Sequence, residues 1–216
     1  MARTTVNPNS PFFHEERHAS LEEIAGKPLT ICGAGALGGN LAETLARMGF
    51  TQLKIIDRDR VEMRNLSTQP YFRAEVGAPK ARALANSLYR AVGAKIEPVT
   101  GELTEANAQK LLAGSALVVD ALDNRAGRAA VSGAALALQV PCLHIGFSGD
   151  GLYGNGLWEP NYRIPGESAG DPCDYPLTRP LVLAITALAT RAITRFLRDG
   201  STSDFELTLN DFKASF

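Results

Sequence analysis

Residues 28–38 read Pro28-Leu29-Thr30-Ile31-Cys32-Gly33-Ala34-Gly35-Ala36-Leu37-Gly38 and carry the strongest structural signal in the sequence. Its short apolar run, bounded by a proline and a glycine, is typical of a buried parallel strand. In the turn that follows, Gly33 permits a tight bend, Gly35 lets a phosphate approach the backbone and Gly38 allows close packing of helix on strand. The helix start then offers free N–H groups and a positive dipole end to an anion. The stretch predicts a strand, a nucleotide-binding turn and a helix.

Apolar runs and helical patterns alternate from residue 28 to about residue 145. Strands are predicted at 29–32, 53–56, 96–99, 116–119 and 141–145, and helices at 80–92, 107–112 and 125–139. A further helix carries Leu41, Leu45 and Met48 and stops at Gly49, and a short one is predicted at 20–25. Such alternation implies right-handed crossovers and a parallel sheet with helices on both faces.

The pattern changes after Gly146. Glycines punctuate residues 149–156 as in the strands of a hairpin, and prolines recur through a long loop at about 160–180. A helix at 181–197 follows, and residues 205–209 alternate as an edge strand does. We predict an N-terminal arm with a short helix over residues 1–27 and one domain over residues 28–216.

Composition narrows the classes of function. The net charge of −1 argues against nucleic acid or an anionic membrane as the partner, because the chain has no overall positive charge to attract a negatively charged surface. The first ten residues lack an apolar stretch, so we expect no secretory signal and a cytoplasmic location. The longest apolar segment, 181–190, is expected to be too short to span a bilayer. Cys32, Cys142 and Cys173 form no Cys-x-x-Cys pair, so neither a disulfide framework nor zinc is expected.

An acidic residue follows the second predicted strand. Asp57 lies about 20 residues beyond Gly38, where an acid can bind ribose hydroxyls. The turn and the acid together favour a nucleotide over a merely close-packed strand–helix turn, with NAD as the alternative to ATP.

Further motifs narrow this choice. They are Asp57-Arg58-Asp59-Arg60-Val61, Asn65-Leu66, Gly77-Ala78-Pro79-Lys80 and Asp120-Ala121-Leu122-Asp123-Asn124. In this order after the glycine turn, they resemble the ThiF, MoeB and E1 family of enzymes that activate ubiquitin-like proteins. The resemblance covers residues 29–142 and continues more weakly to about residue 200. It implies a Rossmann-like three-layer α/β fold with a mixed sheet, parallel in the N-terminal half and antiparallel in the C-terminal strands.

The same resemblance implies an activity. Family members use ATP and Mg²⁺ to adenylate the C-terminal glycine of a ubiquitin-like or sulfur-carrier protein. Such a site must offset the charges of two anions that repel each other. Residues matched to the family's nucleotide site are Gly33, Gly35, Gly38, Asp57, Asp59, Asn65, Lys80, Leu122, Asp123 and Asn124. By this resemblance, Lys80 stabilises the phosphates and Asp123 binds Mg²⁺, while the two aspartates after the second strand hold the ribose and Asn65 orients the triphosphate.

The chain departs from the family at Thr68, where an arginine that reaches the phosphates is usual. Arg64 and Arg73 are the candidates to replace it, and a weakened or non-catalytic member is the alternative. Family members also carry an arginine on the N-terminal arm that completes the partner subunit's site. Arg17 is the candidate here, with a surface arginine as the alternative.

Cys173 lies in the proline-rich loop, where family members that form a thioester place their cysteine. It is the candidate nucleophile, against an incidental loop cysteine, although Asp171 and Asp174 beside it would raise its pKa. The family also implies a homodimer and allows an E2-like protein as a further partner. Two other functions stay open: an NAD-dependent oxidoreductase and a non-catalytic E1-like scaffold subunit.

Overall fold

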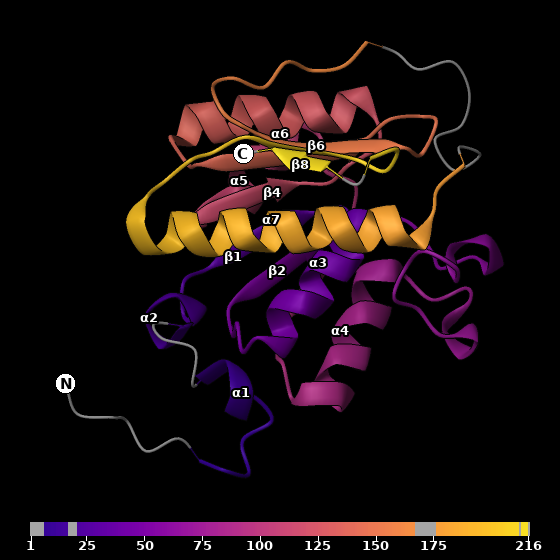
Figure 1. Cartoon of the computed structure of the whole chain (residues 1–216), viewed down its shortest axis with the longest axis vertical. Helices are drawn as coiled ribbons and strands as arrows, with labels where there is room; N and C mark the ends of the chain where they lie inside the picture. Colours follow the sequence, from indigo (N-terminus) through magenta and orange to yellow (C-terminus); the bar gives the residue numbers. More distant parts are fainter. Residues whose placement is uncertain (1–6, 17–20, 167–175, 212, 216) are drawn as a thin grey trace.

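The computed structural model describes residues 7–16, 21–166, 176–211 and 213–215. Its strands are β1 (Leu29–Cys32), β2 (Leu53–Ile56), β3 (Glu97–Val99), β4 (Leu117–Asp120), β5 (Cys142–Phe147), β6 (Tyr153–Trp158), β7 (Phe205–Thr208) and β8 (Lys213–Ser215). Its α-helices are α1 (Phe13–Glu16), α2 (Leu21–Ala25), α3 (Ala36–Arg47), α4 (Lys80–Val92), α5 (Glu105–Leu112), α6 (Arg125–Leu138) and α7 (Arg179–Asp199), with 3₁₀ turns η1 (Met63–Asn65) and η2 (Arg73–Glu75). Figure 1 shows the whole chain, with α7 as its longest helix.

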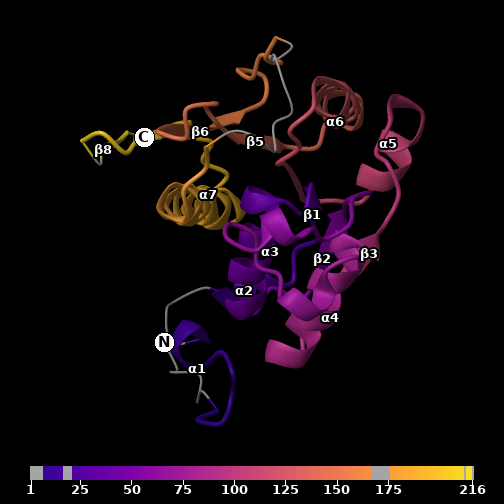
Figure 2. The same cartoon turned by 90° about the vertical axis from the view of Figure 1, so that its right-hand side faces the viewer.

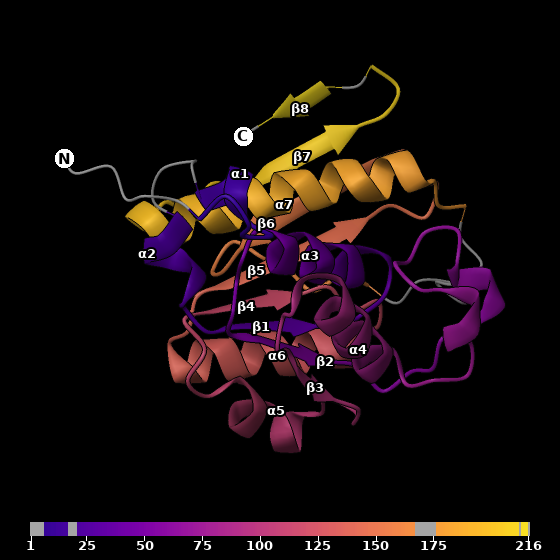
Figure 3. The same cartoon turned by 90° about the horizontal axis from the view of Figure 1, so that it is seen from below.

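The strands form a mixed sheet in the order β3-β2-β1-β4-β5-β6-β7-β8, which can be followed from one end to the other in Figure 3. The first five strands are parallel, and β6, β7 and β8 add antiparallel pairs. The predicted α/β fold with a mixed sheet is confirmed. The change of direction occurs after β5, where the glycine-rich segment forms a hairpin.

Helices cover both faces of the sheet (Figure 2), as predicted. Alternate strand residues divide between two cores because successive side chains point to opposite faces. Ile31 and Val119 pack in the core that includes residues of α3, α4 and α7. Cys32 and Val118 pack in the core that includes residues of α5 and α6.

Helix α7 is longer than the predicted 181–197. It is long and apolar enough to cross a membrane by length and composition alone, so the expectation that this segment is too short was wrong. A buried core helix passes the same test, and half of its most apolar window is buried. Leu181, Ile185 and Ile193 are fully buried in the core shared with α3. Packing against the sheet therefore accounts for its apolar character.

The predicted edge strand near the C-terminus is not at the edge. β7 pairs with β6 on one side and with β8 on the other. Its Phe205 and Leu207 are buried, whereas Glu206 between them is exposed. The alternation identified one buried face correctly. The short and fully exposed β8 has no apolar pattern that would have predicted it.

The register of the sheet brings the functional motifs to one edge. Cys32 pairs with Ile56 on one side and with Asp120 on the other, and Asp120 pairs with His144. The segments that follow β1, β2, β4 and β5 therefore leave the sheet side by side. In open α/β sheets, ligands bind at this carboxyl edge.

Candidate functional site

The glycine turn after β1 contains two glycines that the packing requires. Gly33 has a φ of +97°, and a Cβ on it would lie 2.8 Å from the carbonyl oxygen of Ala121. A Cβ on Gly38 would lie 2.0 Å from the carbonyl oxygen of Gly33. By contrast, a Cβ on Gly35 would meet no atom within 4 Å. The space in front of Gly35 is open, and this is where a phosphate could approach the backbone.

The backbone of Ala34 is held from both sides. Its N–H donates to Oδ2 of Asp57 at 2.6 Å, and its carbonyl accepts from the hydroxyl of Tyr71 at 2.6 Å. The other oxygen of Asp57 accepts from the N–H of Asp59 at 2.7 Å. Burial raises the pKa of Asp57, against the opposing effect of these hydrogen bonds and of Lys80. Burial likewise raises the pKa of Tyr71. These contacts fix the shape of the turn.

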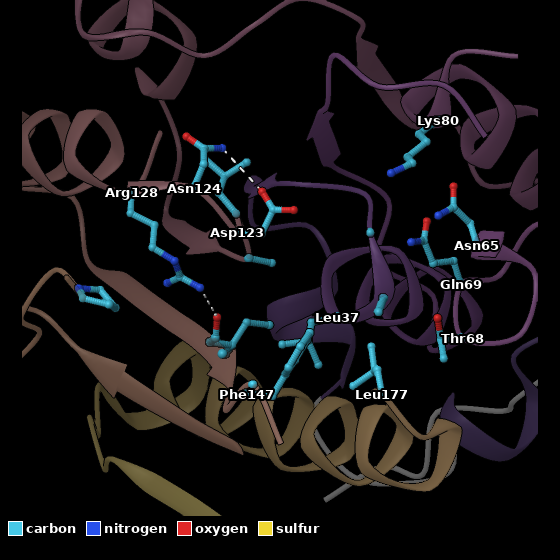
Figure 4. Close-up of a pocket in the computed structure, with 18 of the residues that line it drawn as sticks. Leu37, Asn65, Thr68, Gln69, Lys80, Asp123, Asn124, Arg128, Phe147 and Leu177 are labelled. Atoms are coloured by element: carbon cyan, nitrogen blue, oxygen red, sulfur yellow. Dashed lines mark hydrogen bonds between the residues drawn. The ribbon is translucent and has the colours of Figure 1, made fainter. Parts of the chain in front are cut away.

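Two adjoining cavities lie at this edge of the sheet. The larger has a volume of about 700 Å³ and extends from Gly35 and Asn65 to Phe147 and Leu177, and Figure 4 shows residues that line it. The smaller, of about 80 Å³, is a groove along Asp57, Asp59 and residues 101–103. Gly35, Lys80 and residues 121–124 line both. The shape suits an elongated ligand with one end in the groove and the other in the cavity.

Lys80 is a buried group despite its position at a helix start. Its side chain is 7% exposed, and its Nζ lies 3.5 Å from Oδ2 of Asp59. Asn65 is also buried; its Oδ1 accepts from the backbone N–H of Glu62 at 2.9 Å. Both side chains line the larger cavity, on the side shown at the right of Figure 4.

The segment after β4 carries Leu122, Asp123 and Asn124, and all three line both cavities. Oδ1 of Asn124 accepts from the N–H of Gly127 at 2.8 Å, so Asn124 caps α6. Asp123 is exposed to the cavity between Lys80 and Arg128 (Figure 4).

Asp123 is the carboxylate in this lining that could hold a magnesium ion together with phosphates. Within the described ranges, no group of three or more His, Cys, Asp or Glu side chains is close enough to hold a metal. Mg²⁺ usually takes one or two carboxylates from the protein and completes its shell with water and substrate phosphates. The donor set here has this form.

Among the charged side chains that line the larger cavity, cations predominate. Among its described residues, Arg64, Lys80, Arg125 and Arg128 are positive, whereas Asp123 is the acidic member. Thr68 is buried and lines the cavity where an arginine had been expected. Of the two candidates to replace it, Arg64 lines the cavity; Arg73 is exposed and is not part of this lining. An excess of positive charge favours an anionic ligand.

Gln69 has an unpaired polar atom in this lining. Its Oε1 is buried and has no hydrogen-bond partner among the residues that the structure describes. A buried acceptor without a partner costs about 1–3 kcal/mol. Oε1 of Gln69 is therefore a candidate to accept a hydrogen bond from a ligand in the cavity. The sequence around Gln69 did not indicate this role.

The remaining predicted residues fall into two groups. Arg17 and Cys173 lie outside the described residues. Cys32 and Cys142 are buried in the core, and burial raises the pKa of both thiols well above the ordinary value. His144 is buried and has two carboxylate neighbours, Asp120 and Glu159.

The ThiF family model matches residues 9–158, which is more than half of the chain. The chain belongs to the ThiF family. It is 32% identical over 139 residues to the SAMP-activating enzyme E1 of Haloferax volcanii, a match that covers 59% of this chain and 51% of the relative. It is 38% identical over 120 residues to the sulfur carrier protein ThiS adenylyltransferase of Bacillus subtilis, covering 53% of this chain and 35% of the relative.

This ThiF-family chain thus spans about half or less of the length of these relatives. Among solved structures, E. coli MccB with AMPCPP and MccA superposes with a TM-score of 0.80 at 14% identity, over 98% of this chain and 71% of that one. At this identity the likeness shows a shared fold. The mixed α/β architecture is therefore that of the family's structural neighbours.

Proposed function

We propose that this chain adenylates the C-terminal glycine carboxylate of a small ubiquitin-like or sulfur-carrier protein, using ATP and Mg²⁺. The observation that carries the proposal is the cationic cavity that continues into an acidic groove beside the glycine turn. Such a pair of spaces suits a nucleoside triphosphate, and the cavity leaves room for a second anion. Membership of the ThiF family and relatives named as adenylyltransferases support the same conclusion.

The reaction joins two anions. A carboxylate oxygen of the partner protein attacks the α-phosphorus of ATP, and the bond from that phosphorus to the oxygen bridging to the β-phosphate breaks. Pyrophosphate leaves with the electron pair of that bond, and an acyl-adenylate remains, without net transfer of a proton. The site must hold both anions in line and offset their charge, which is the main contribution of a protein to such a step.

The chain's own residues divide this task. The open space at Gly35 and the N–H groups that begin α3 receive the phosphates. Lys80, fixed by burial, neutralises phosphate charge, and Asn65 and Gln69 contribute hydrogen-bonding groups from the same side. Asp59 lines the groove for the ribose, while Asp57 braces the turn. Asp123 would hold the magnesium ion, which when bound offsets charge on the phosphates.

Other parts of the activity rest on the family resemblance. A thioester on Cys173, a homodimer in which Arg17 reaches the other subunit's site, an E2-like partner and a cytoplasmic location belong to this proposal. As an alternative to the thioester, the activated C-terminus of the adenylate is sulfurated. Cys173→Ala would separate these routes, since it should leave adenylation intact and remove a thioester.

The test is exchange of labelled pyrophosphate into ATP. The purified chain would be mixed with Mg-ATP and a small protein that ends in Gly-Gly, taken from the genes beside its own. Exchange should require the partner's terminal glycine, so a partner that lacks this residue is the matched control. Asp123→Asn should reduce exchange and raise the magnesium concentration needed for half-maximal rate.

Two results would contradict the proposed activity, and a third would contradict the role of Asp123. Binding of NAD in place of ATP would point to an oxidoreductase. The chain could bind Mg-ATP yet catalyse no pyrophosphate exchange with a partner protein that supports exchange by a homologous enzyme. That result would point to a scaffold subunit. Unaltered exchange in the Asp123→Asn variant would refute the assignment of the metal-binding residue.

A further inference from the structure

A buried chain of polar side chains lies beside the larger cavity. Asp120, at the end of β4, is fully buried, and its Oδ2 lies 2.8 Å from Nδ1 of His144 on β5. The other ring nitrogen of His144 lies 3.0 Å from Oε1 of Glu159, which also accepts a hydrogen bond from Ser132 of α6. His144 is therefore fixed at both nitrogens by groups on neighbouring elements.

The ring of His144 also carries a stacked partner. Tyr162 lies parallel to it, with ring centroids 3.6 Å apart and an interplanar angle of 5°. The hydroxyl of Tyr162 accepts a hydrogen bond from Nη1 of Arg128 at 3.1 Å. The same Nη1 lies 3.4 Å from Oδ2 of Asp120. Asp120, His144, Tyr162 and Arg128 thus form a closed ring of contacts, which we name the histidine clamp.

The clamp leaves Arg128 with unused donors. A guanidinium has five N–H groups. Among the described residues, Arg128 donates to three acceptors: Asp120, Tyr162 and the carbonyl of Ile145 at 3.0 Å. Burial acts to lower the pKa of Arg128, but Asp120 and Tyr162 outweigh it and the pKa is raised. A largely buried and permanently charged arginine with two remaining N–H groups therefore lines the cavity.

Arg128 lies away from the proposed nucleotide end. It lines the larger cavity but not the groove beside Asp57 and Asp59. Figure 4 shows it on the opposite side of Asp123 from Lys80. The two cations thus occupy separate walls of one cavity, with the acidic residue between them. The reaction has two anionic reactants, and this arrangement provides a separate cation for each.

We propose that Arg128 receives the carboxylate of the second reactant and that His144 is the residue that positions it. The inference rests on the proposed adenylation. It adds that the peptide carboxylate is bound from the wall of β5 and α6, on the opposite side of Asp123 from Lys80. Asp120 contributes twice, because its other oxygen accepts from the N–H of Leu122 at 3.0 Å and so holds the turn that carries Asp123. The clamp therefore couples the two halves of the site.

The experiment compares two ligands on the full chain. The first is Mg-ATP. The second is a sulfamoyl adenosine that carries a glycylglycyl group, a stable analogue of the acyl-adenylate. Arg128→Gln should lower the affinity for the analogue by about 10- to 100-fold, the range expected for a charge-assisted hydrogen bond. The loss of affinity for Mg-ATP should be several times smaller than the loss of affinity for the analogue. Arg82→Gln, a change at an exposed arginine of α4, is the matched control.

Variants of the clamp test positioning. Tyr162→Leu removes both the stacked ring and the acceptor, and it should weaken the analogue with little effect on Mg-ATP. Tyr162→Phe keeps the ring and should restore much of the affinity. His144→Gln should act like Tyr162→Leu, with thermal denaturation to verify folding. If His144→Gln does not fold, the two tyrosine variants decide the question by themselves.

The outcomes separate the two proposals. Wild-type protein that binds neither ligand would end the proposed function and this inference with it. The wild-type protein could bind both ligands while Arg128→Gln lowers the two affinities equally, or lowers neither. That outcome would overturn this inference but leave the proposed function intact. A Tyr162→Leu variant that loses thermal stability but keeps full affinity for the analogue would show that the clamp is structural only.

Discussion

The carboxylate of Asp57 accepts a hydrogen bond from the backbone N–H of Ala34 at 2.6 Å. The acid at the end of β2 is thereby bound to the turn that follows β1, across the edge where both strands leave the sheet. Since Tyr71 donates to the carbonyl of the same alanine, the turn is braced from two segments. The shape of the turn is therefore set before any ligand binds, which reduces the ordering cost of binding.

Asp57→Asn is expected to alter the pH dependence of stability. Burial raises the pKa of Asp57 in the folded protein above the ordinary 3.8. A raised carboxyl pKa contributes stability that is fully present below 3.8 and is lost as pH rises through the folded pKa. The difference in unfolding free energy, wild type minus Asp57→Asn, should therefore fall as pH rises above 3.8 and then level off.

Urea denaturation of both proteins at a series of pH values from about 4 to 7 would measure this difference. A difference that increases with pH would contradict the prediction. It would mean that the two backbone hydrogen bonds to Asp57 outweigh the cost of burying its charge.

Gly35→Ala and Gly38→Ala form a matched pair on one turn. A Cβ at Gly38 would lie 2.0 Å from the carbonyl oxygen of Gly33, so this variant should lose about 3 kcal/mol or more of stability through overpacking. A Cβ at Gly35 has no atom within 4 Å, so this variant should fold normally. It should nevertheless bind Mg-ATP about 10-fold more weakly, because the methyl group occupies the approach to the backbone.

Thermal denaturation and calorimetric titration with Mg-ATP would test both members of this pair. Equal loss of stability in the two variants would show that the turn tolerates no side chain at either position. Full affinity of Gly35→Ala for Mg-ATP would mean that the phosphates do not approach the backbone there.

Local sequence signals predicted the elements around this turn well. β1 and β2 have the predicted bounds, and α4 begins at Lys80 and ends at Val92 as expected. β1 and α4 are each bounded by a proline and a glycine, which end elements through the backbone alone. The pairing of β7 with β8 could not be predicted, because it depends on a partner segment without an apolar pattern.

Motifs in the sequence predicted several of the residues that line the two cavities. Lys80 was identified by its motif, although its burial depends on how α4 and the segment after β2 pack together. The histidine clamp was not predicted. Asp120 and His144 are separated by a whole helix in the chain, and only the parallel register of β4 and β5 brings them together. Side chains that meet through strand pairing leave no spacing pattern in the sequence.

Lys80→Ala should lower the affinity for Mg-ATP and the rate of pyrophosphate exchange. The buried ammonium lies 3.5 Å from Asp59 and faces the cavity, so its loss removes a fixed cation. The rate should fall by about 100- to 1,000-fold, as for other preorganised charges in excluded sites. The control is Lys95→Ala, which changes an exposed lysine.

Two measurements separate charge from structure in the Lys80 variant. Circular dichroism should show an intact fold, and exchange should be slowed at saturating Mg-ATP. A variant with normal exchange would show that Lys80 only balances the carboxylate of Asp59.

Cys32 and Cys142 should resist alkylation in the folded protein. Both thiols are buried, and burial raises their pKa well above the ordinary 9.0. Because the thiolate is the reactive form, iodoacetamide at about pH 8 should modify them at least about 100-fold more slowly than in urea. Mass spectrometry of peptides after timed labelling would give the rate at each cysteine. Rapid labelling of Cys32 in the native protein would show that the core between β1 and α6 opens far more readily than its packing indicates, since proteins with such cores open locally only at a cost in free energy.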